Sequence, residues 1–294
     1  MMTKQHTSRM HPSSLFTYFQ YLNQARKKEM MDYRRFVAFH HIMRNQALST
    51  FFQPILNLDK GENVGYEILN RPPASELFPT TEHFYDFVGQ TDQVSLFEMG
   101  CRQISLRSFR EKAAGLPERN NSLIFMNVHP HALSEEHITS GELLELVEQY
   151  GLSPGQIVFE LTEKQAVTDY ETYEGILASY RAAGFRIAID DAGSGYNSLK
   201  TLVYLKPEYV KLDRSLIQDI HLNPVQQQIV TILVEYANKS GTQVIAEGIE
   251  RMEELAYLRE RGVHMGQGYA LGRPSSELIR GVVPDSGAQA AAAF

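Results

Sequence analysis

Short apolar segments that alternate with helical segments constrain the fold of this chain more than any other feature. Six predicted strands follow this alternation, at residues 123–128, 157–161, 185–190, 209–212, 243–246 and 264–269. Helical segments separate them at residues 141–150, 170–183, 199–205, 225–240 and 253–261, and four of these are followed by Gly151, Gly184, Gly241 and Gly262. Glycine commonly ends helices because it adopts the left-handed conformation without steric cost. Strands that alternate with helices predict a parallel sheet covered by helices.

Two earlier strands, at residues 51–58 and 63–69, complete a set of eight. The tight turn Asp59-Lys60-Gly61 joins them and is too short for a helical crossover, so they are expected to pair antiparallel. A long, mostly helical segment follows at residues 75–116. The sequence therefore predicts an α/β fold, a TIM-like (β/α)8 barrel of about 250 residues with its first strand antiparallel and an N-terminal helical extension. A doubly wound open sheet is the alternative, although no Gly-rich phosphate-binding fingerprint occurs early in the chain.

The N-terminal 50 residues differ in charge from the rest of the chain. They hold 8 Lys and Arg against 2 Asp and Glu, whereas the remainder holds 20 against 33, and the net charge is −7. An acidic body argues against a DNA-binding face. We expect residues 1–45 to form a tail and a helical arm, residues 46–281 to form the barrel, and residues 282–294 to form a disordered tail.

The arm has apolar residues near helical spacing between residues 13 and 47, interrupted by Arg26-Lys27-Lys28. One helix and two helices are equally consistent with this pattern. The simplest expectation is an arm packed on the main domain. The alternatives are a docking helix for a regulatory protein partner or a second subunit, and a helix on an anionic membrane surface.

Cysteine content and hydropathy indicate a cytoplasmic setting. Cys101 is the only cysteine, so no intrachain disulfide can form, and a reducing compartment is expected. The N-terminus is polar and lacks a signal-peptide pattern. No apolar run approaches the roughly 20 residues that a transmembrane helix needs. We therefore expect no transmembrane segment.

Polar and charged residues stand where the predicted strands end. In strand order they are Glu67, Asn127, Glu160, Asp190 with Asp191, Lys211, Glu247 and Gln267. Because the active site of such a barrel lies at the C-terminal ends of its strands, these side chains should meet at the barrel mouth. Each has an ordinary alternative when taken alone: Lys211 could extend to solvent, Glu247 could begin a helix and Asn127 could cap a turn. The recurrence at seven strand ends favours a common site.

Five carboxylates and an amide form an oxygen ligand set that suits Mg²⁺ or Mn²⁺. Zinc is less suited, because no His or Cys falls at these strand ends. His40, His41, His129 and His131 fall in predicted helices or loops. The adjacent Asp190 and Asp191 suit two ions, one carboxylate bridging them, and paired ions commonly clamp an in-line phosphoryl displacement. Lys211 would hold the attacking water or neutralise charge that develops on phosphate.

The sequence resembles the EAL domain family of cyclic-di-GMP phosphodiesterases over roughly residues 42–278. Eight motifs of that family occur in order. They are Gln53-Pro54-Ile55, Glu67-Ile68-Leu69 with Arg71, Asn127 within FMNVHPHAL, Glu160-Leu161-Thr162-Glu163, Asp190 to Gly195, Lys211 to Asp213, Ala246 to Glu250, and Gln267 to Tyr269 with Pro274 after it.

This resemblance implies hydrolysis of cyclic-di-GMP to linear pGpG with two Mg²⁺ or Mn²⁺ ions, in a homodimer. It assigns one ion to Glu67, Asn127, Glu160 and Asp190, and the other to Asp190, Asp191 and possibly Glu247. It gives catalytic roles to Lys211, Glu247 and Gln267, and a role in steadying the loop after Asp191 to Glu163. It gives nucleotide binding to Gln53 and Arg71.

Two residues depart from the family pattern. Ile68 replaces an alanine, which leaves the metal chemistry untouched, and Ala192 replaces a phenylalanine in the loop after the paired aspartates. Since every metal and catalytic position is present, we expect an active phosphodiesterase. The alternatives are a receptor or interaction module that binds cyclic-di-GMP with little or no turnover, and a barrel enzyme that acts on another phosphate ester.

Overall fold

The structure is a computed structural model that describes residues 12–128, 140–162, 170–193 and 198–284. The chain divides into two compact units. The first contains Met1–Ala47 and Pro72–Gln90, and the second contains Leu48–Arg71 and Thr91–Phe294. Residues 72–90 thus group with the N-terminal arm, whereas the sequence reading assigned them to the barrel.

The second unit contains eight strands that close into a barrel in sequence order. These strands are β1 (Ser49–Asn57), β2 (Asn63–Arg71), β3 (Leu123–Asn127), β4 (Ile157–Thr162), β5 (Arg186–Ala192), β6 (Tyr209–Leu212), β7 (Gln243–Ala246) and β8 (Met265–Gly266). β1 pairs antiparallel with both β2 and β8, and all other neighbours are parallel. The predicted barrel with an antiparallel first strand is confirmed, and the open-sheet alternative is excluded.

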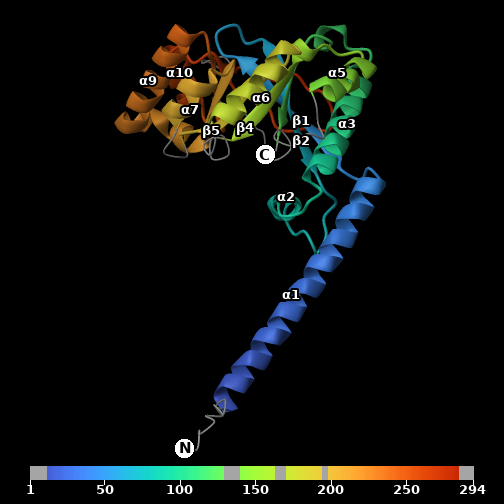
Figure 1. Cartoon of the computed structure of the whole chain (residues 1–294). Helices are drawn as coiled ribbons and strands as arrows, with labels where there is room; N and C mark the ends of the chain where they lie inside the picture. Colours follow the sequence, from blue (N-terminus) through green and yellow to red (C-terminus); the bar gives the residue numbers. More distant parts are fainter. Residues whose placement is uncertain (1–11, 129–139, 163–169, 194–197, 285–294) are drawn as a thin grey trace, which may run out of the picture. The chain divides into compact units, whose positions relative to one another are not determined.

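Helices cover the outside of the strands (Figure 1). They are α3 (Val94–Ala113), α5 (Ser140–Gln149), α6 (Tyr170–Ala182), α7 (Ser198–Leu205), α8 (Arg214–Ile217), α9 (Pro224–Ser240) and α10 (Met252–Glu260), with short 3-10 helices at Pro117–Arg119, Pro154–Gln156 and Ile220–Leu222. Gly151, Gly184, Gly241 and Gly262 all have positive φ, between 65° and 94°. The glycine signals therefore located these helix ends correctly.

The barrel interior is a small apolar layer, and it determines where the polar side chains point. Ile55, Phe125, Val158, Ala188, Tyr209, Ile245 and Met265 fill this layer, one from each of seven strands. Successive side chains of a strand point to opposite faces, so the residue two positions further on points inward again. The same inward-facing pattern occurs near the carboxyl ends of six strands. The triplets are Phe125-x-Asn127, Val158-x-Glu160, Ala188-x-Asp190, Tyr209-x-Lys211, Ile245-x-Glu247 and Met265-x-Gln267, the last two reaching just beyond β7 and β8. The antiparallel β1 places Gln53 two residues before Ile55, at the same rim.

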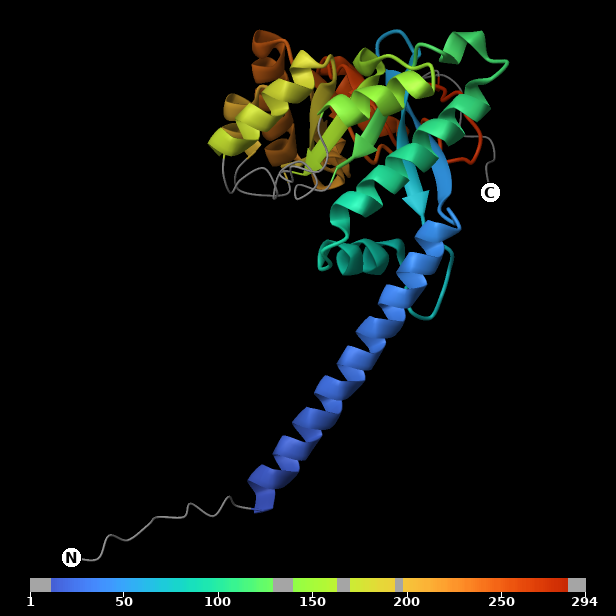
Figure 2. The ribbon, with the colours of Figure 1, turned by 45° about the vertical axis from the view of Figure 1, so that its right-hand side comes forward.

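The first unit consists of α1 (Pro12–Arg44), α2 (Thr81–Gly89) and the segment that precedes α2. An aromatic cluster of Phe39, Phe78 and Phe84 joins α1 and α2, and Arg35 Nε donates to the carbonyl of Leu77 at 3.2 Å. α1 is one uninterrupted helix (Figure 2), because Arg and Lys are good helix formers and do not break it. The mostly helical segment expected at residues 75–116 is confirmed as two helices, α2 and α3, and Thr80 caps the start of α2 by accepting from the N–H of His83.

The C-terminal segment keeps contact with the second unit up to the end of the described chain. The N–H of Val282 donates to the carbonyl of Leu271 at 2.9 Å, and Val283 packs against the core. Residues 285–294 of the predicted tail, like residues 1–11, lie outside the described residues. None of the described helices is both long and apolar enough to cross a membrane.

Candidate active site

Lys211 is the centre of a carboxylate cluster at the carboxyl end of the barrel. Its Nζ lies 2.7 Å from Glu160 Oε1 and 2.7 Å from Glu247 Oε1. It also lies 3.3 Å from Asp190 Oδ1 and 3.4 Å from Glu67 Oε2. The four acids come from β2, β4, β5 and the residue after β7, so barrel closure alone brings them together. The Lys211 side chain is 1% exposed, which rules out the solvent-extended alternative.

Burial and mutual repulsion shift the protonation of this cluster. The Glu160 carboxyl is fully buried, and burial raises its pKa well above the usual range even though Lys211 opposes the shift. Burial likewise raises the pKa of Glu247 to about 8, again against the effect of Lys211. Burial alone would lower the pKa of Lys211, but the four surrounding carboxylates outweigh it and hold that pKa well above its ordinary value. Lys211 is therefore a permanent cation, and the raised pKa values of Glu160 and Glu247 favour proton uptake, which a bound divalent cation would oppose.

Three amide side chains, those of Gln53, Asn127 and Gln267, form an amide row next to Glu67. Gln267 Nε2 donates to Gln53 Oε1 at 3.0 Å and also to Glu67 Oε2. Asn127 Nδ2 lies 3.4 Å from Glu67 Oε1. Gln53 Nε2 in turn donates to the carbonyl of Gly272 at 3.2 Å. Gly272 is a contact that sequence reasoning missed, because a backbone carbonyl leaves no side-chain signal.

The paired aspartates adopt an unusual backbone where β5 ends. Asp191 has φ of 56°, in the left-handed region, and its N–H donates to Asp190 Oδ1 at 3.0 Å. One carboxylate oxygen each from Asp190, Asp191 and Glu247 lie within 4.8 Å of one another. The turn thus aims the two neighbouring carboxyl groups at the same region as Glu247.

The residues fit hard divalent cations. All side chains of the cluster other than Lys211 offer carboxylate or amide oxygens, the ligands that Mg²⁺ and Mn²⁺ prefer. Glu160 Oε2 and Gln267 Oε1 are buried and have no hydrogen-bond partner among the residues that the structure describes. An acceptor oxygen buried without a donor is costly unless a cation reaches it. Asp190, Asp191 and Glu247 could hold one ion, and Glu67, Asn127 and Glu160 offer oxygens for another.

One predicted site residue, Arg71, stands apart from this cluster. Arg71 is exposed at the end of β2, where its guanidinium lies over the Phe51 ring at 4.6 Å from the centroid. Glu163 lies outside the described residues, as do His129 and His131. All the other predicted site residues belong to the cluster or the amide row around it.

The fold and this rim define a metal-dependent class of (β/α)8 barrel, with an acidic site for hard cations at the mouth. The EAL domain model matches residues 36–274. The chain belongs to the EAL domain family.

Curated relatives carry phosphodiesterase names. The chain is 31% identical over 256 residues to the probable cyclic di-GMP phosphodiesterase PdeB of Escherichia coli, covering 84% of this chain and 48% of that protein. It is 28% identical over 239 residues to the cyclic di-GMP phosphodiesterase RocR of Pseudomonas aeruginosa, covering 79% of this chain and 59% of that protein. The chain thus spans about half the length of these relatives.

Two similar solved structures contain bound cyclic-di-GMP. BlrP1 of Klebsiella pneumoniae, in a complex with calcium and cyclic-di-GMP, has a TM-score of 0.71 and 27% identity, over 81% of this chain and 58% of that one. A standalone EAL protein of Vibrio cholerae with bound cyclic-di-GMP has a TM-score of 0.69 and 30% identity, over 80% of this chain and 95% of that one.

Proposed function

We propose that this protein hydrolyses one phosphodiester bond of cyclic-di-GMP and releases linear 5′-pGpG, using two Mg²⁺ or Mn²⁺ ions. The observation that carries the proposal is the buried Lys211 surrounded by four carboxylates at the barrel rim. The phosphodiesterase names of the relatives and the ligands of the solved structures support the choice of substrate. The single Cys101 supports a reaction in the cytoplasm.

Glu67, Asn127, Glu160 and Asp190 would hold one ion, and Asp190, Asp191 and Glu247 the other. Ions in such a site stabilise charge on phosphoryl oxygens and make water more acidic. Water oxygen attacks phosphorus, the bond from phosphorus to the 3′ oxygen breaks, and that oxygen takes up a proton. Lys211 supplies a fixed positive charge for the charge that develops in the transition state. Glu247, whose carboxylate lies 2.7 Å from Lys211 Nζ, would receive the proton that water loses.

The remaining assignments concern binding and assembly. Gln267 holds Glu67 in place by donating to its carboxylate, and Gln53 orients Gln267 by accepting a hydrogen bond from it. Gln53 and Arg71 would bind the nucleotide, with the exposed Arg71 guanidinium free to reach a phosphate at the rim. Glu163 would steady the loop after Asp191. A homodimer completes the proposal, and the N-terminal arm is where a second subunit or a regulatory protein partner would dock.

Purified protein incubated with Mn²⁺ and cyclic-di-GMP tests this function, with products separated by chromatography. We expect pGpG from the wild type and from Lys239→Met, a control at an exposed lysine of α9. Glu67→Gln and Lys211→Met should lose turnover, because each removes a member of the cluster. Folded protein that yields no product with Mn²⁺ or Mg²⁺ would refute the proposal. Recovery of bound, intact dinucleotide would instead identify a receptor.

A further inference from the structure

The exposed face of α1 carries a pattern that the proposed function does not use. Phe19, Leu22, Arg26, Glu29, Tyr33 and Phe36 recur at alternating spacings of three and four residues. This is the heptad spacing of the core positions of a coiled coil. We call these six residues the α1 seam. Phe19 is 60% exposed and Tyr33 is 65% exposed, so the described chain leaves the seam uncovered.

Four basic residues lie on the outer side of the same helix. Lys27, Lys28, Arg34 and Arg35 occupy the heptad positions that point away from the seam. A helix that lies flat on a membrane surface has basic residues on one face and a continuous apolar face against the lipid. Here the seam itself has Arg26 and Glu29 at its middle, which would enter the lipid. The pattern therefore favours a helix as the partner rather than a lipid surface.

The order of residues along the seam is self-complementary in one direction only. In an antiparallel pair of α1 helices with a two-fold axis between residues 27 and 28, Arg26 lies opposite the partner's Glu29. Leu22 then lies opposite the partner's Tyr33, and Phe19 opposite the partner's Phe36. A parallel pair in register would instead set Arg26 against the partner's Arg26 and Glu29 against the partner's Glu29. Like charges in adjacent layers destabilise such a pair.

We propose that two copies of this chain associate through the α1 seam as an antiparallel, two-fold symmetric helix pair, in which Arg26 and Glu29 form reciprocal ion pairs. Neither residue has an ion-pair partner within the described part of the chain. Isologous two-fold pairing is the commonest form of homo-oligomer. Pairing would also stabilise α1 itself, because the stability of a helix in water comes mainly from tertiary contacts on one face.

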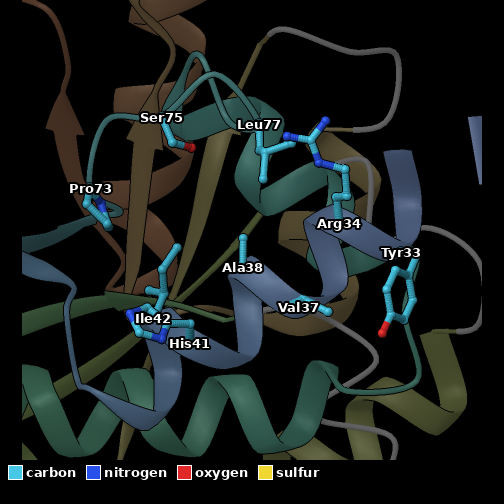
Figure 3. A pocket seen from close by; sticks show the side chains of 9 residues that line it. All are labelled: Tyr33, Arg34, Val37, Ala38, His41, Ile42, Pro73, Ser75 and Leu77. Atoms are coloured by element: carbon cyan, nitrogen blue, oxygen red, sulfur yellow. The ribbon is translucent and has the colours of Figure 1, made fainter. Parts of the chain in front are cut away.

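A groove in the first unit adjoins the α1 seam at Tyr33. It has a volume of about 540 Å³ and lies between α1 and the segment before α2 (Figure 3). Tyr33 of the seam and Val37 beside it line this groove, with Pro73 and Leu77 on the other side. In the antiparallel pair, Val37 lies opposite the partner's Tyr18, whose ring is exposed in the single chain. The groove thus provides an apolar seat for the amino-terminal turns of the partner's helix.

Sedimentation equilibrium of the full chain tests the association. We expect a species of twice the 33.4 kDa chain mass. Leu22→Glu and Tyr33→Glu should weaken the dimer by about tenfold or more, since each puts charge on a buried seam position. Tyr21→Glu is the matched control, because this neighbouring aromatic is 66% exposed and points away from the seam. A monomer at all concentrations, or a dimer that both seam variants leave intact, would overturn the proposal.

Charge exchange tests the direction of the pair. Arg26→Glu alone and Glu29→Arg alone should each weaken the dimer, and the double exchange should restore it. A parallel pair would gain nothing from the double exchange.

Spin labels give the direction independently. In an antiparallel pair, labels at Lys28 lie close together across the two-fold axis. Labels at Gln20 are separated along the axis by 15 residues, about 22 Å at 1.5 Å per residue. Cys101 is buried, and labelled wild type controls for it. Short distances at both positions would contradict the antiparallel arrangement. Monomeric protein that binds phosphatidylserine vesicles through α1 would identify a membrane helix instead.

Discussion

The variant Lys211→Met removes the cation from the centre of the carboxylate cluster while keeping most of the side-chain volume. In the absence of metal, Glu160, Glu247, Asp190 and Glu67 then face one another with no positive charge among them. Removing one partner of a buried ion pair typically costs about 3–5 kcal/mol. For a chain of this size each kcal/mol shifts Tm by about 2–4 °C. We therefore expect the Tm of the metal-free variant to fall by about 6–20 °C.

Divalent cations should reverse most of this loss. They supply the missing positive charge, and they no longer compete with the Lys211 ammonium for the same oxygens. Calorimetry with EDTA and again with Mn²⁺ should show a larger Mn²⁺-induced rise in Tm for Lys211→Met than for wild type. Lys239→Met serves as the control and should match wild type in both conditions. A metal-free Lys211→Met protein as stable as wild type would refute the electrostatic reasoning.

Four further predictions concern the same rim. The raised pKa of Glu247, about 8, means that ion binding near pH 7 displaces protons. Affinity for Mn²⁺ should therefore increase up to about pH 8 and then level off, with proton release seen by titration calorimetry in two buffers. Because Glu247 binds its proton more tightly in the folded state, its protonation stabilises the metal-free protein at low pH. This contribution is lost as the pH rises from about 4.5 to about 8, so the Tm of the metal-free protein should fall across this range and level off above it. Gly193→Ala should lower Tm by several degrees, because φ is +98° and the new Cβ would lie 2.2 Å from Leu216 Cδ1. Ala192→Phe should also lower Tm, since Ala192 is completely buried and overpacking typically costs about 1–3 kcal/mol; a Tm equal to wild type would mean that the core has room for the ring.

The fold was largely predictable because its signals are local. The turn at Gly61 dictated an antiparallel hairpin, and glycines such as Gly241 ended helices where the backbone turns left-handed. The number of helices in the arm could not be predicted, again for a local reason. A run of Arg26, Lys27 and Lys28 interrupts an apolar pattern without interrupting helix formation, so pattern and propensity give different answers.

The sequence predicted which residues form the site, but not how their side chains contact one another. Strand-end placement selected Glu160, Asp190 and Lys211 correctly as neighbours, since parallel strands end at one rim. The sequence contains no information on which carboxylates contact Lys211 most closely, because that depends on barrel closure and side-chain rotamers. It also gave no sign of Gly272, which holds Gln53 through a backbone carbonyl. For Arg71, contact with Phe51 rather than with the cluster was equally unforeseeable.

Anomalous diffraction at the manganese edge, from crystals grown with Mn²⁺ and cyclic-di-GMP, tests the central claim most directly. The account predicts two manganese peaks at the barrel mouth. Glu67, Asn127, Glu160 and Asp190 should surround one, and Asp190, Asp191 and Glu247 the other, with a phosphate of the dinucleotide beside both. Dinucleotide bound at the rim with no manganese among these carboxylates would contradict it.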